Sequence, residues 1–304
     1  MTMTAKVHGL YPAVKVGEDY IYQITSMRIP PGIRRMLLAD GIYNLFTAVE
    51  QQDPRIQFTT TAIAAALAIA GAEGVPIVAA TNELDVWLRR RTIAGKYTSG
   101  AAHVQITGHN GILYPQAINA DQAGASIDYE FVPYYDGTNE PLVKTPTSSL
   151  SGSPTIAEAF VAGPVSINGT ALEGIQSISV AFNIVLDLIF AEGGVWATFL
   201  DIASIQPIVR LRTMDALSIV TFGLSGLAQN DTDSEVYLRA VDKNGMREAD
   251  ATAAHIKIAI DDGTIEVSDI SADPRTPYNT EVVITPTYDG TALPLAITTG
   301  QAIT

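Results

Sequence analysis

Residues Phe131-Val-Pro-Tyr-Tyr-Asp-Gly-Thr-Asn-Glu-Pro-Leu142 recur later in the chain as Ile284-Thr-Pro-Thr-Tyr-Asp-Gly-Thr-Ala-Leu-Pro-Leu295. Seven of the twelve positions are identical, and the two segments lie 153 residues apart in a chain of 304 residues. Self-similarity at a long fixed offset is the sequence signature of a duplicated structural unit. These segments therefore predict that the chain contains two related copies of one domain.

Four further matches keep the same order along the chain and nearly the same offset. They pair Gly41-Ile42-Tyr43 and Phe46 with Gly194-Val195-Trp196 and Phe199, Pro54 with Pro207, Val86–Arg89 with Val236–Arg239, and Ala101–Val104 with Ala253–Ile256. Between the copies, residues 144–154 consist mostly of Ser, Thr, Pro and Gly, a composition typical of linkers. We therefore expect a first domain at residues 1–145, a linker at residues 146–154 and a second domain at residues 155–304.

Alternating and β-rich runs dominate each copy, which favours strands over helices. Asp-Gly and Asn-Gly pairs between or just after several runs are typical of hairpin turns, because they accept positive φ angles. The sequence thus predicts a mainly β fold of two tandem β-barrel or β-sandwich domains. In the first copy, the expected strands are Tyr20–Ile29, Ile42–Val49, Arg55–Thr60, Val86–Arg90, His103–Thr107, Ile112–Pro115 and Ile127–Pro133.

One short α-helix is expected in each copy. Residues 61–70 are rich in alanine, and Gly71 can end a helix there. Thr60 or Thr61 can cap its start, and Thr213 is the expected cap in the second copy. The apolar stripe of the first helix is expected to consist of Ile63, Leu67 and Ala70.

The composition excludes several classes of protein. With 18 Lys+Arg against 32 Asp+Glu, the formal net charge is −14, which argues against a protein that grips phosphate backbones. The 47% of hydrophobic residues excludes disorder, and the absence of cysteine excludes disulfides and thiolate chemistry. The most apolar stretch, residues 62–72, is too short to cross a bilayer, and the N-terminus does not resemble a secretory signal. We expect a protein that is made in a cytoplasm and does not enter a membrane.

The sequence offers no recognisable catalytic pattern. It contains no glycine-rich phosphate-binding motif, no nucleophile elbow and no zinc-binding helix pattern. His103 and His255 occupy equivalent places in the two copies, and we expect both to be ordinary strand or interface residues. The acidic cluster Asp231–Glu235 opens like a calcium loop but lacks the glycine that such a loop requires. We therefore expect no catalytic residue, no cofactor and no metal ion.

One cluster of basic residues, Arg89-Arg90-Arg91, stands out on this acidic chain. Three arginines could meet a nucleic acid, but the fork-shaped guanidinium group also binds carboxylates on a neighbouring subunit. Because the chain is acidic overall, we favour inter-subunit ion pairs for Arg89, Arg90 and Arg91.

A strand is followed directly by a helix at Phe58-Thr-Thr-Thr-Ala-Ile-Ala-Ala-Ala-Leu67 and again at Leu211-Arg-Thr-Met-Asp-Ala-Leu217. Together with the expected β-barrel carrying one helix, the acidity and the lack of cysteine, these steps resemble the major tail tube proteins of long-tailed bacteriophages. The resemblance covers nearly the whole chain. It implies that the duplicated chain fills two of six places in a ring, so that three chains form a pseudo-hexameric ring.

This resemblance implies a structural role and not an enzymatic one. Rings would stack into the tail tube of the virion, after assembly in the host cytoplasm. Strands of neighbouring domains would continue one another around a closed inner barrel, and an acidic wall would let viral DNA pass without binding it. The implied partners are further copies of the chain, together with tape-measure and tail-end proteins.

In this family, a long loop after the second strand reaches towards the adjacent ring, and the matching segments here are Ile29–Asp40 and Phe182–Gly193. Phe182–Phe190 is unusually apolar for a loop, so a buried strand is the alternative interpretation. The candidates for ring stacking are Ile33, Arg34, Arg35, Met36, Ile184, Leu186, Leu188 and Phe190.

Two other functions remain open on the sequence alone. A distal tail or baseplate hub protein of the same fold would form one ring and would not polymerise. A carbohydrate-binding β-sandwich module would stack sugars on exposed aromatic side chains such as Tyr134, Tyr135 and Tyr288. Tyr134 aligns with Thr287 in the second copy, so the two copies share only one of these tyrosine positions.

Overall fold

The computed structural model describes residues 7–40, 43–91, 103–149, 158–191, 193–214, 229–231, 233–273, 276–288, 290 and 293–304. Strands make up most of these residues, and α1 (Ile63–Ala70) is the only helix among them. The expectation of a mainly β fold is therefore confirmed. We call residues 7–149 the first half and residues 158–304 the second half.

The described residues of each half form a series of twelve strands. In the first half they are β1 (Val7–Val16), β2 (Asp19–Tyr22), β3 (Ile24–Arg28), β4 (Ile33–Asp40), β5 (Tyr43–Gln52), β6 (Ile56–Thr60), β7 (Val75–Ile77), β8 (Leu84–Arg91), β9 (His103–Gly108), β10 (Gly111–Asp121), β11 (Ala125–Pro133) and β12 (Leu142–Ser148). In the second half they are β13 (Phe160–Ile167), β14 (Thr170–Leu172), β15 (Ile175–Ala181), β16 (Ile184–Phe190), β17 (Ala197–Ile205), β18 (Ile208–Thr213), β19 (Gln229–Asp231), β20 (Ser234–Ala240), β21 (His255–Ile260), β22 (Gly263–Asp273), β23 (Thr276–Pro286) and β24 (Ala296–Gln301).

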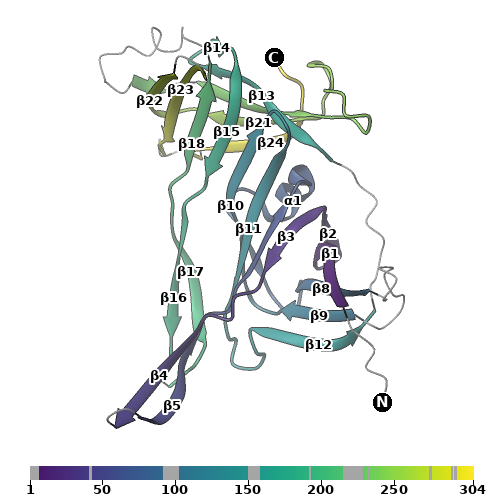
Figure 1. Cartoon of the computed structure of the whole chain (residues 1–304), viewed down its shortest axis with the longest axis vertical. Coiled ribbons are helices and arrows are strands. Elements are labelled where there is room, and N and C mark those ends of the chain that lie inside the picture. Colours follow the sequence, from purple (N-terminus) through teal and green to yellow (C-terminus); the bar gives the residue numbers. More distant parts are fainter. Residues whose placement is uncertain are drawn as a thin grey trace.

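One large sheet runs through both halves. It has ten strands, in the order β19-β22-β23-β18-β15-β10-β11-β6-β3, with β7 beside β10. Each half adds a sheet of five strands, β12-β9-β8-β1-β2 in the first half and β14-β13-β20-β21-β24 in the second. Buried apolar side chains from all three sheets and from α1 form one continuous core cluster. The remaining pairs, β4–β5 and β16–β17, are hairpins that extend from the body towards the same end of the molecule (Figure 1).

The second half repeats the strand pairings of the first. The pairs β1–β2, β1–β8, β8–β9, β9–β12, β3–β6, β6–β11, β10–β11, β7–β10 and β4–β5 recur as β13–β14, β13–β20, β20–β21, β21–β24, β15–β18, β18–β23, β22–β23, β19–β22 and β16–β17. The register recurs as well, because Phe131 lies opposite Ile56, and Ile284 lies opposite Val209. Both members of the second pair lie 153 residues after their counterparts in the first.

Left-handed backbone positions also recur, here 151 residues apart. They are Gly17 and Asn168, Gln23 and Gly174, and Gly32 and Asn183. Gln23, with a φ of 55°, interrupts the single strand expected at Tyr20–Ile29 and separates β2 from β3. That expectation is therefore wrong. A left-handed residue other than glycine costs roughly 1–2 kcal/mol, which is why the sequence pattern alone did not place a break there.

Helix α1 ends at Gly71 as its sequence predicts, but it begins later than expected, at Ile63, and its N-cap is Ala62 and neither Thr60 nor Thr61. The Thr60 hydroxyl accepts a hydrogen bond from the Ala62 N–H at 3.0 Å, and the Gly71 N–H closes the helix on the Leu67 carbonyl at 2.8 Å. The expected stripe is buried, and Ala66 belongs to it too. A carboxylate from the second half, Glu158, accepts the Ala64 N–H at 3.2 Å, next to the positive end of the helix. The expected second helix falls on residues 215–228, which lie outside the described part of the chain.

Two expectations about loops need correction. The segments Ile29–Asp40 and Phe182–Gly193 are not loops, because they contain β4 and β16. Phe182–Phe190 is not a buried strand either, since residues from Ile184 onward alternate between half-buried and exposed. In a two-stranded hairpin each strand pairs with the other along one edge, so a strand can persist away from the core. The expected linker at residues 146–154 also starts too early, because β12 continues to Ser148.

The remaining expected strands correspond to β5, β6, β8, β9, β10 and β11. Strand β10 is much longer than expected, because Pro115 does not end it. A register shift between Pro115 and Ala117 lets the strand continue to Asp121. The added residues are the ones that pair with the second half.

Packing around Phe131 supplies a test of the core. The ring is fully buried, and a Cβ atom added at Gly108 would lie 2.3 Å from its Cε1 atom. We expect Gly108→Ala to lower the free energy of unfolding by about 1–3 kcal/mol, the usual cost of overpacking a core. Urea unfolding followed by circular dichroism measures this change.

The matched control is Gly124→Ala, because no heavy atom lies within 4 Å of a Cβ added there. We expect this control to stay within about 0.5 kcal/mol of the parent protein, as surface substitutions usually do. Equal effects of the two substitutions would contradict the packing described at Phe131.

Candidate self-assembly surface

The two halves are joined by strand pairing between β10 of the first and β15 of the second. Ala117–Asp121 lies antiparallel to Ser177–Ala181. Across this join, the Ser179 hydroxyl donates a hydrogen bond to the Asn119 side-chain oxygen at 2.8 Å. In the repeat, β10 corresponds to β22, and β15 corresponds to β3. The join therefore connects two different edges of the repeated unit, in a head-to-tail manner.

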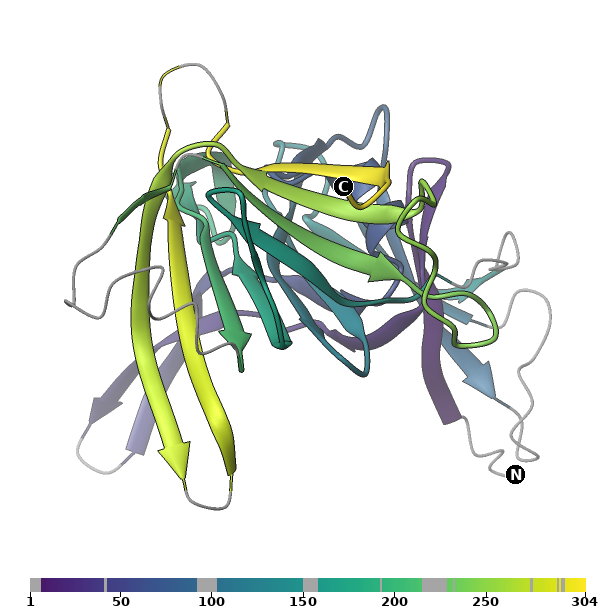
Figure 2. The ribbon, with the colours of Figure 1, turned by 90° about the horizontal axis from the view of Figure 1, so that it is seen from above.

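The complementary edges remain uncovered among the described residues. Strand β3 ends the ten-stranded sheet on one side. On the other side, β19 covers only Gly263–Ile265 of β22, so that Asp269–Asp273 has a neighbour on one edge only. Figure 2 shows β22 and β23 as a long hairpin at the margin of the molecule. An uncovered edge presents unpaired N–H and C=O groups to which another chain can add a strand.

The ten-stranded sheet has one apolar face and one polar face. Burial alternates along β6, β15 and β18, which places apolar side chains in the core and polar ones on the opposite face. Arg210 and Arg212 both approach the Glu281 carboxylate on this polar face, at 3.2 and 3.8 Å. Acidic side chains on the polar face include Asp121, Asp128, Glu130, Glu266, Asp269 and Glu281.

In the first half, the polar face contains a buried carboxylate with four hydrogen-bond donors. Glu130 is only 4% exposed. It accepts hydrogen bonds from Arg55 at 3.2 Å, Gln57 at 2.9 Å, Tyr114 at 2.8 Å and Gln116 at 2.7 Å. Burial, together with the hydrogen bond to Glu130, raises the pKa of Tyr114 well above its usual range. These contacts link neighbouring strands and make this part of the polar face rigid.

All eight residues expected to mediate ring stacking lie on the two hairpins. On β4, Ile33 and Met36 are 43% and 45% exposed. Arg35 is exposed beside them, and Arg34 forms an ion pair with Glu50 across the hairpin at 3.2 Å. This hairpin therefore carries apolar and charged side chains that no other described part of the chain covers.

On β16 the expected residues and the most exposed residues lie on opposite faces. Ile184, Leu186, Leu188 and Phe190 are half-buried. The opposite face carries Val185 and Ile189, which are 53% and 55% exposed, and Ile189 lies opposite Phe199, itself 52% exposed. Sequence reasoning missed this outer face, although the alternation of a strand would have indicated it.

The tip of the β16–β17 hairpin docks on the first half. The Gln52 N–H donates to the Val195 carbonyl at 2.7 Å, and the Trp196 indole N–H donates to the Gln52 side-chain oxygen at 2.9 Å. The Tyr135 N–H donates to the Ala197 carbonyl at 2.7 Å. The rings of Tyr135 and Trp196 lie 5.4 Å apart at an angle of 38°. Hydrogen bonds and one aromatic contact thus fix the tip, and sequence reasoning had found none of them.

Beside Trp196 the docking site is largely apolar. Its lining residues are Ile29, Pro31, Ile33, Gln52, Pro54, Glu140, Pro141 and Leu142. Three of these are prolines, and their fixed φ angles restrict the conformation of the backbone that lines the site.

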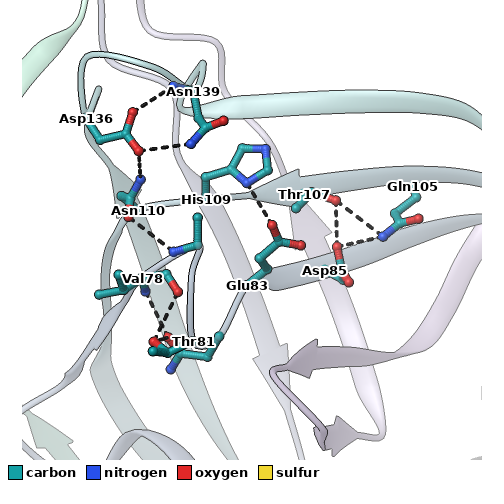
Figure 3. Close-up of polar contacts among 12 residues, drawn as sticks. Val78, Thr81, Glu83, Asp85, Gln105, Thr107, His109, Asn110, Asp136 and Asn139 are labelled. Carbon is teal, nitrogen blue, oxygen red and sulfur yellow. Dashed lines mark hydrogen bonds and ion pairs between the residues drawn. The ribbon is translucent and has the colours of Figure 1, made fainter.

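Tyr135 is held in place by the turn that follows it. Asp136 accepts the N–H group of Thr138 at 2.8 Å. It also accepts the N–H group of Asn139 at 2.7 Å and the side-chain amides of Asn110 and Asn139 at 2.7 and 3.0 Å (Figure 3). Hydrogen bonds to its carboxylate, first from Asn139 and then from Thr138, lower the pKa of Asp136 to about 2. The aspartate of the repeated Tyr-Asp-Gly-Thr motif therefore has a structural role.

The expected ion-pair cluster, Arg89 to Arg91, lies at the end of β8, opposite Val7–Gly9 of β1. The side chains of Arg89, Arg90 and Arg91 lie outside what the structure describes, so their pairing with another subunit stays a prediction. The backbone places all three at one end of the five-stranded sheet of the first half.

Both equivalent histidines are buried in strands. The His255 Nδ1 atom accepts the Ala240 N–H at 3.0 Å, and its Nε2 atom lies 3.0 Å from the Ala249 carbonyl, to which it donates. Both ring nitrogens are therefore engaged with the backbone. His103 is 1% exposed at the equivalent position in β9. These positions agree with the expected role as ordinary strand residues.

The tyrosines considered for sugar binding do not form one surface. Tyr135 contacts Trp196, whereas Tyr288 is 65% exposed and lies in the other half. Within the described ranges, no three His, Asp or Glu side chains gather in a way that could hold a metal ion. No helix in the described part is long and apolar enough to cross a membrane. No protein-family model and no curated protein matches the chain.

Docking of the hairpin tip can be tested by hydrogen exchange. We expect Trp196→Ala to raise the exchange rates of the Gln52 and Tyr135 amides at least about tenfold, because the lost aromatic contact and hydrogen bond are together worth about 1.4 kcal/mol or more. Mass spectrometry of peptides containing residues 52 and 135 measures the rates. Phe199→Ala, on the exposed face of the same hairpin, serves as control and should leave both rates unchanged.

The turn at Asp136 predicts a pH dependence. Because its pKa in the folded protein is about 2, below the unfolded value of 3.8, the stabilisation is present above pH 3.8 and is lost as the pH falls towards 2. We expect Asp136→Asn to lower the melting temperature at pH 6 and to have a much smaller effect near pH 2. Asp261→Asn, in the exposed connection between β21 and β22, is the control and should change the melting temperature little at either pH.

Proposed function

We propose that this protein polymerises as stacked rings into the tail tube of a long-tailed bacteriophage. In this proposal the chain consists of two tandem tail-tube-like domains, and three chains fill the six positions of one ring. The observation that carries the proposal is the head-to-tail join between β10 and β15. A contact between two different edges of a repeated unit leaves one free edge of each kind, and repetition of the contact yields a closed ring or an open filament.

The free edges match each other in register. If β22 and β3 of the next chain pair as β10 and β15 do, Ser271 lies opposite Arg28, and Ile270 lies opposite Ile29. Pro30 and Pro31 follow immediately and end this pairing, because proline has no N–H to donate. Asp269, two residues before Ser271, lies on the same face and diagonally across from Arg28. The edges are therefore complementary in charge as well as in backbone hydrogen bonding.

In such a ring, the polar face of the ten-stranded sheet would form the wall of the channel. Its acidic side chains, among them Asp121, Asp128 and Glu266, repel phosphate groups. Arg210 and Arg212 lie on the same face, but both approach Glu281 and are thereby partly neutralised. DNA would pass along this wall without the counterion release that accompanies tight binding. No catalytic step, cofactor or metal ion is part of this function.

The two hairpins supply the contacts between rings in this proposal. They point the same way from the body, so a ring would carry six of them on one side (Figure 1). Their outer faces expose Arg34 and Met36 on β4, and Val185, Ile189 and Phe199 on the second hairpin. Exposed apolar patches with a charged rim are typical of protein interfaces. Tape-measure and tail-end proteins would limit the length of the tube in the virion.

The direct experiment is negative-stain electron microscopy of the purified protein, with the mass measured by light scattering on the same sample. Stacked rings or tubes with a central hole are the expected result. Lone rings that never stack would favour the distal tail or baseplate hub instead. A monomer at high concentration, with or without a tape-measure protein as template, would contradict the proposal.

The matched edges predict a charge-reversal rescue. We expect Arg28→Glu alone, and Asp269→Arg alone, to raise the protein concentration needed for ring formation at least about tenfold, since like charges across an interface cost about 1.4 kcal/mol or more. The double variant should form rings at nearly the parent concentration. Rings are scored by micrograph and by light scattering. If the double variant is no better than the single ones, this register is wrong.

A further inference from the structure

The docked hairpin tip has a counterpart elsewhere in the sequence. Gly194-Val195-Trp196, which lies on the first half, corresponds in sequence to Gly41-Ile42-Tyr43. Tyr43 begins β5, opposite Asp40 at the end of β4. This second tip belongs to the β4–β5 hairpin, which points away from the body (Figure 1). The chain therefore contains two hairpin ends that correspond in sequence, and the one at Trp196 lies on the first half.

An equivalent receiving surface exists on the second half. Tyr135, which contacts Trp196, corresponds to Tyr288, and Glu140 beside it corresponds to Leu293. Tyr288 is 65% exposed, whereas Tyr135 is half-buried. Leu293 is 54% exposed, and its counterpart Glu140 is exposed as well. Large apolar side chains with this exposure are what a docking surface looks like when its partner is missing.

The two hairpins also differ in how far their apolar side chains are buried. Leu188 on β16 is half-buried, and its counterpart Leu37 on β4 is 59% exposed. Ile184 is likewise half-buried and packs against the core, while its counterpart Ile33 is 43% exposed. The described side chains of β16 are thus better covered than their counterparts on β4.

From these differences we infer that the tip of the β4–β5 hairpin docks on the second half of another copy of this chain, beside Tyr288 and Leu293. The occupant is the end of the β4–β5 hairpin, and by sequence correspondence Tyr43 takes the place that Trp196 has within the chain. The inference rests on the proposed head-to-tail ring. In this ring, the copy whose β3 pairs with β22 of a chain also docks its β4–β5 hairpin on the second half of that chain. Within one chain, the second half contributes β15 and the β16–β17 hairpin to the first half in the same way.

In this arrangement, the side chains of Tyr288 and Leu293, which are otherwise exposed to water, contact the hairpin of another copy. Within the chain, the second half contributes β15 and the β16–β17 tip to one neighbour, and that neighbour contributes β10 and Tyr135. Between chains, the corresponding elements are β3 and the β4–β5 tip from one chain, and β22 and Tyr288 from the other. Each join in a ring would then have two separate contacts. One is the strand pairing at the sheet edge, and the other is the docked hairpin tip, which we call the clasp.

Cysteine-specific crosslinking tests this clasp, because the chain contains no cysteine of its own. The test variant is Tyr43→Cys with Tyr288→Cys, treated with a flexible bismaleimide under conditions in which the parent protein assembles. We expect a ladder of covalent multimers on a denaturing gel, ending at the number of chains per ring seen in micrographs. A mixture of the two single variants should give covalent dimers and nothing larger.

The matched control is Tyr135→Cys with Trp196→Cys, which should crosslink within one chain and leave the mass of a monomer. A second test pair, Tyr43→Cys with Leu293→Cys, covers the case in which replacing Tyr288 prevents assembly. Rings without a ladder from either pair, while the control reacts, would overturn the clasp and leave the proposed function standing. A ladder that runs past the ring number would place the contact between rings, which also overturns it. Absence of any ring in the parent protein would remove the proposed function and the clasp together.

Discussion

The structure depends on the hydrogen bonding of a strand edge. A β-strand with a free edge leaves every second backbone N–H and C=O pair without a partner in the protein. In this chain the first half provides such an edge at β10, and the second half fills it with β15. The join extends one sheet through both halves and lets a single core form behind it. The arrangement of the hairpins and of the polar face follows from this one contact.

The sequence predicted what depends on local pattern. Alternation located most strands, the alanine-rich run located α1, and Gly71 located its end. The break at Gln23 was missed, because glutamine rarely adopts a left-handed conformation and only comparison with Gly174 reveals it. Strands β4 and β16 were expected to be loops, because apolar residues in exposed strands do not show the burial that usually marks a strand. The docking of Trp196 on Tyr135 depends on residues 61 positions apart, and no local pattern reports such a contact.

The two halves have kept their backbone and changed their side chains. Glu130 and its four donors occupy one half, and the equivalent of Glu130 in the other half is Val283. Likewise, Asp85 accepts from Gln105 in the first half, and the equivalent pair in the second is Glu235 with Lys257. The hydrogen bond from Lys257 holds the pKa of Glu235 below its usual range. Backbone pairing tolerates such exchanges because it makes no use of the side chain.

Joining two copies in one chain would also change the kinetics of the proposed self-association. The β10–β15 contact forms during folding, at the high effective concentration that a covalent tether provides, and it does not depend on how much protein is present. In the proposed ring, only the outer edges, β3 and β22, would have to find each other by diffusion. In a ring of six units, half of the contacts would be made before any two chains meet. The remaining contacts alone would set the threshold concentration at which assembly begins, and a cell could control assembly by covering one strand.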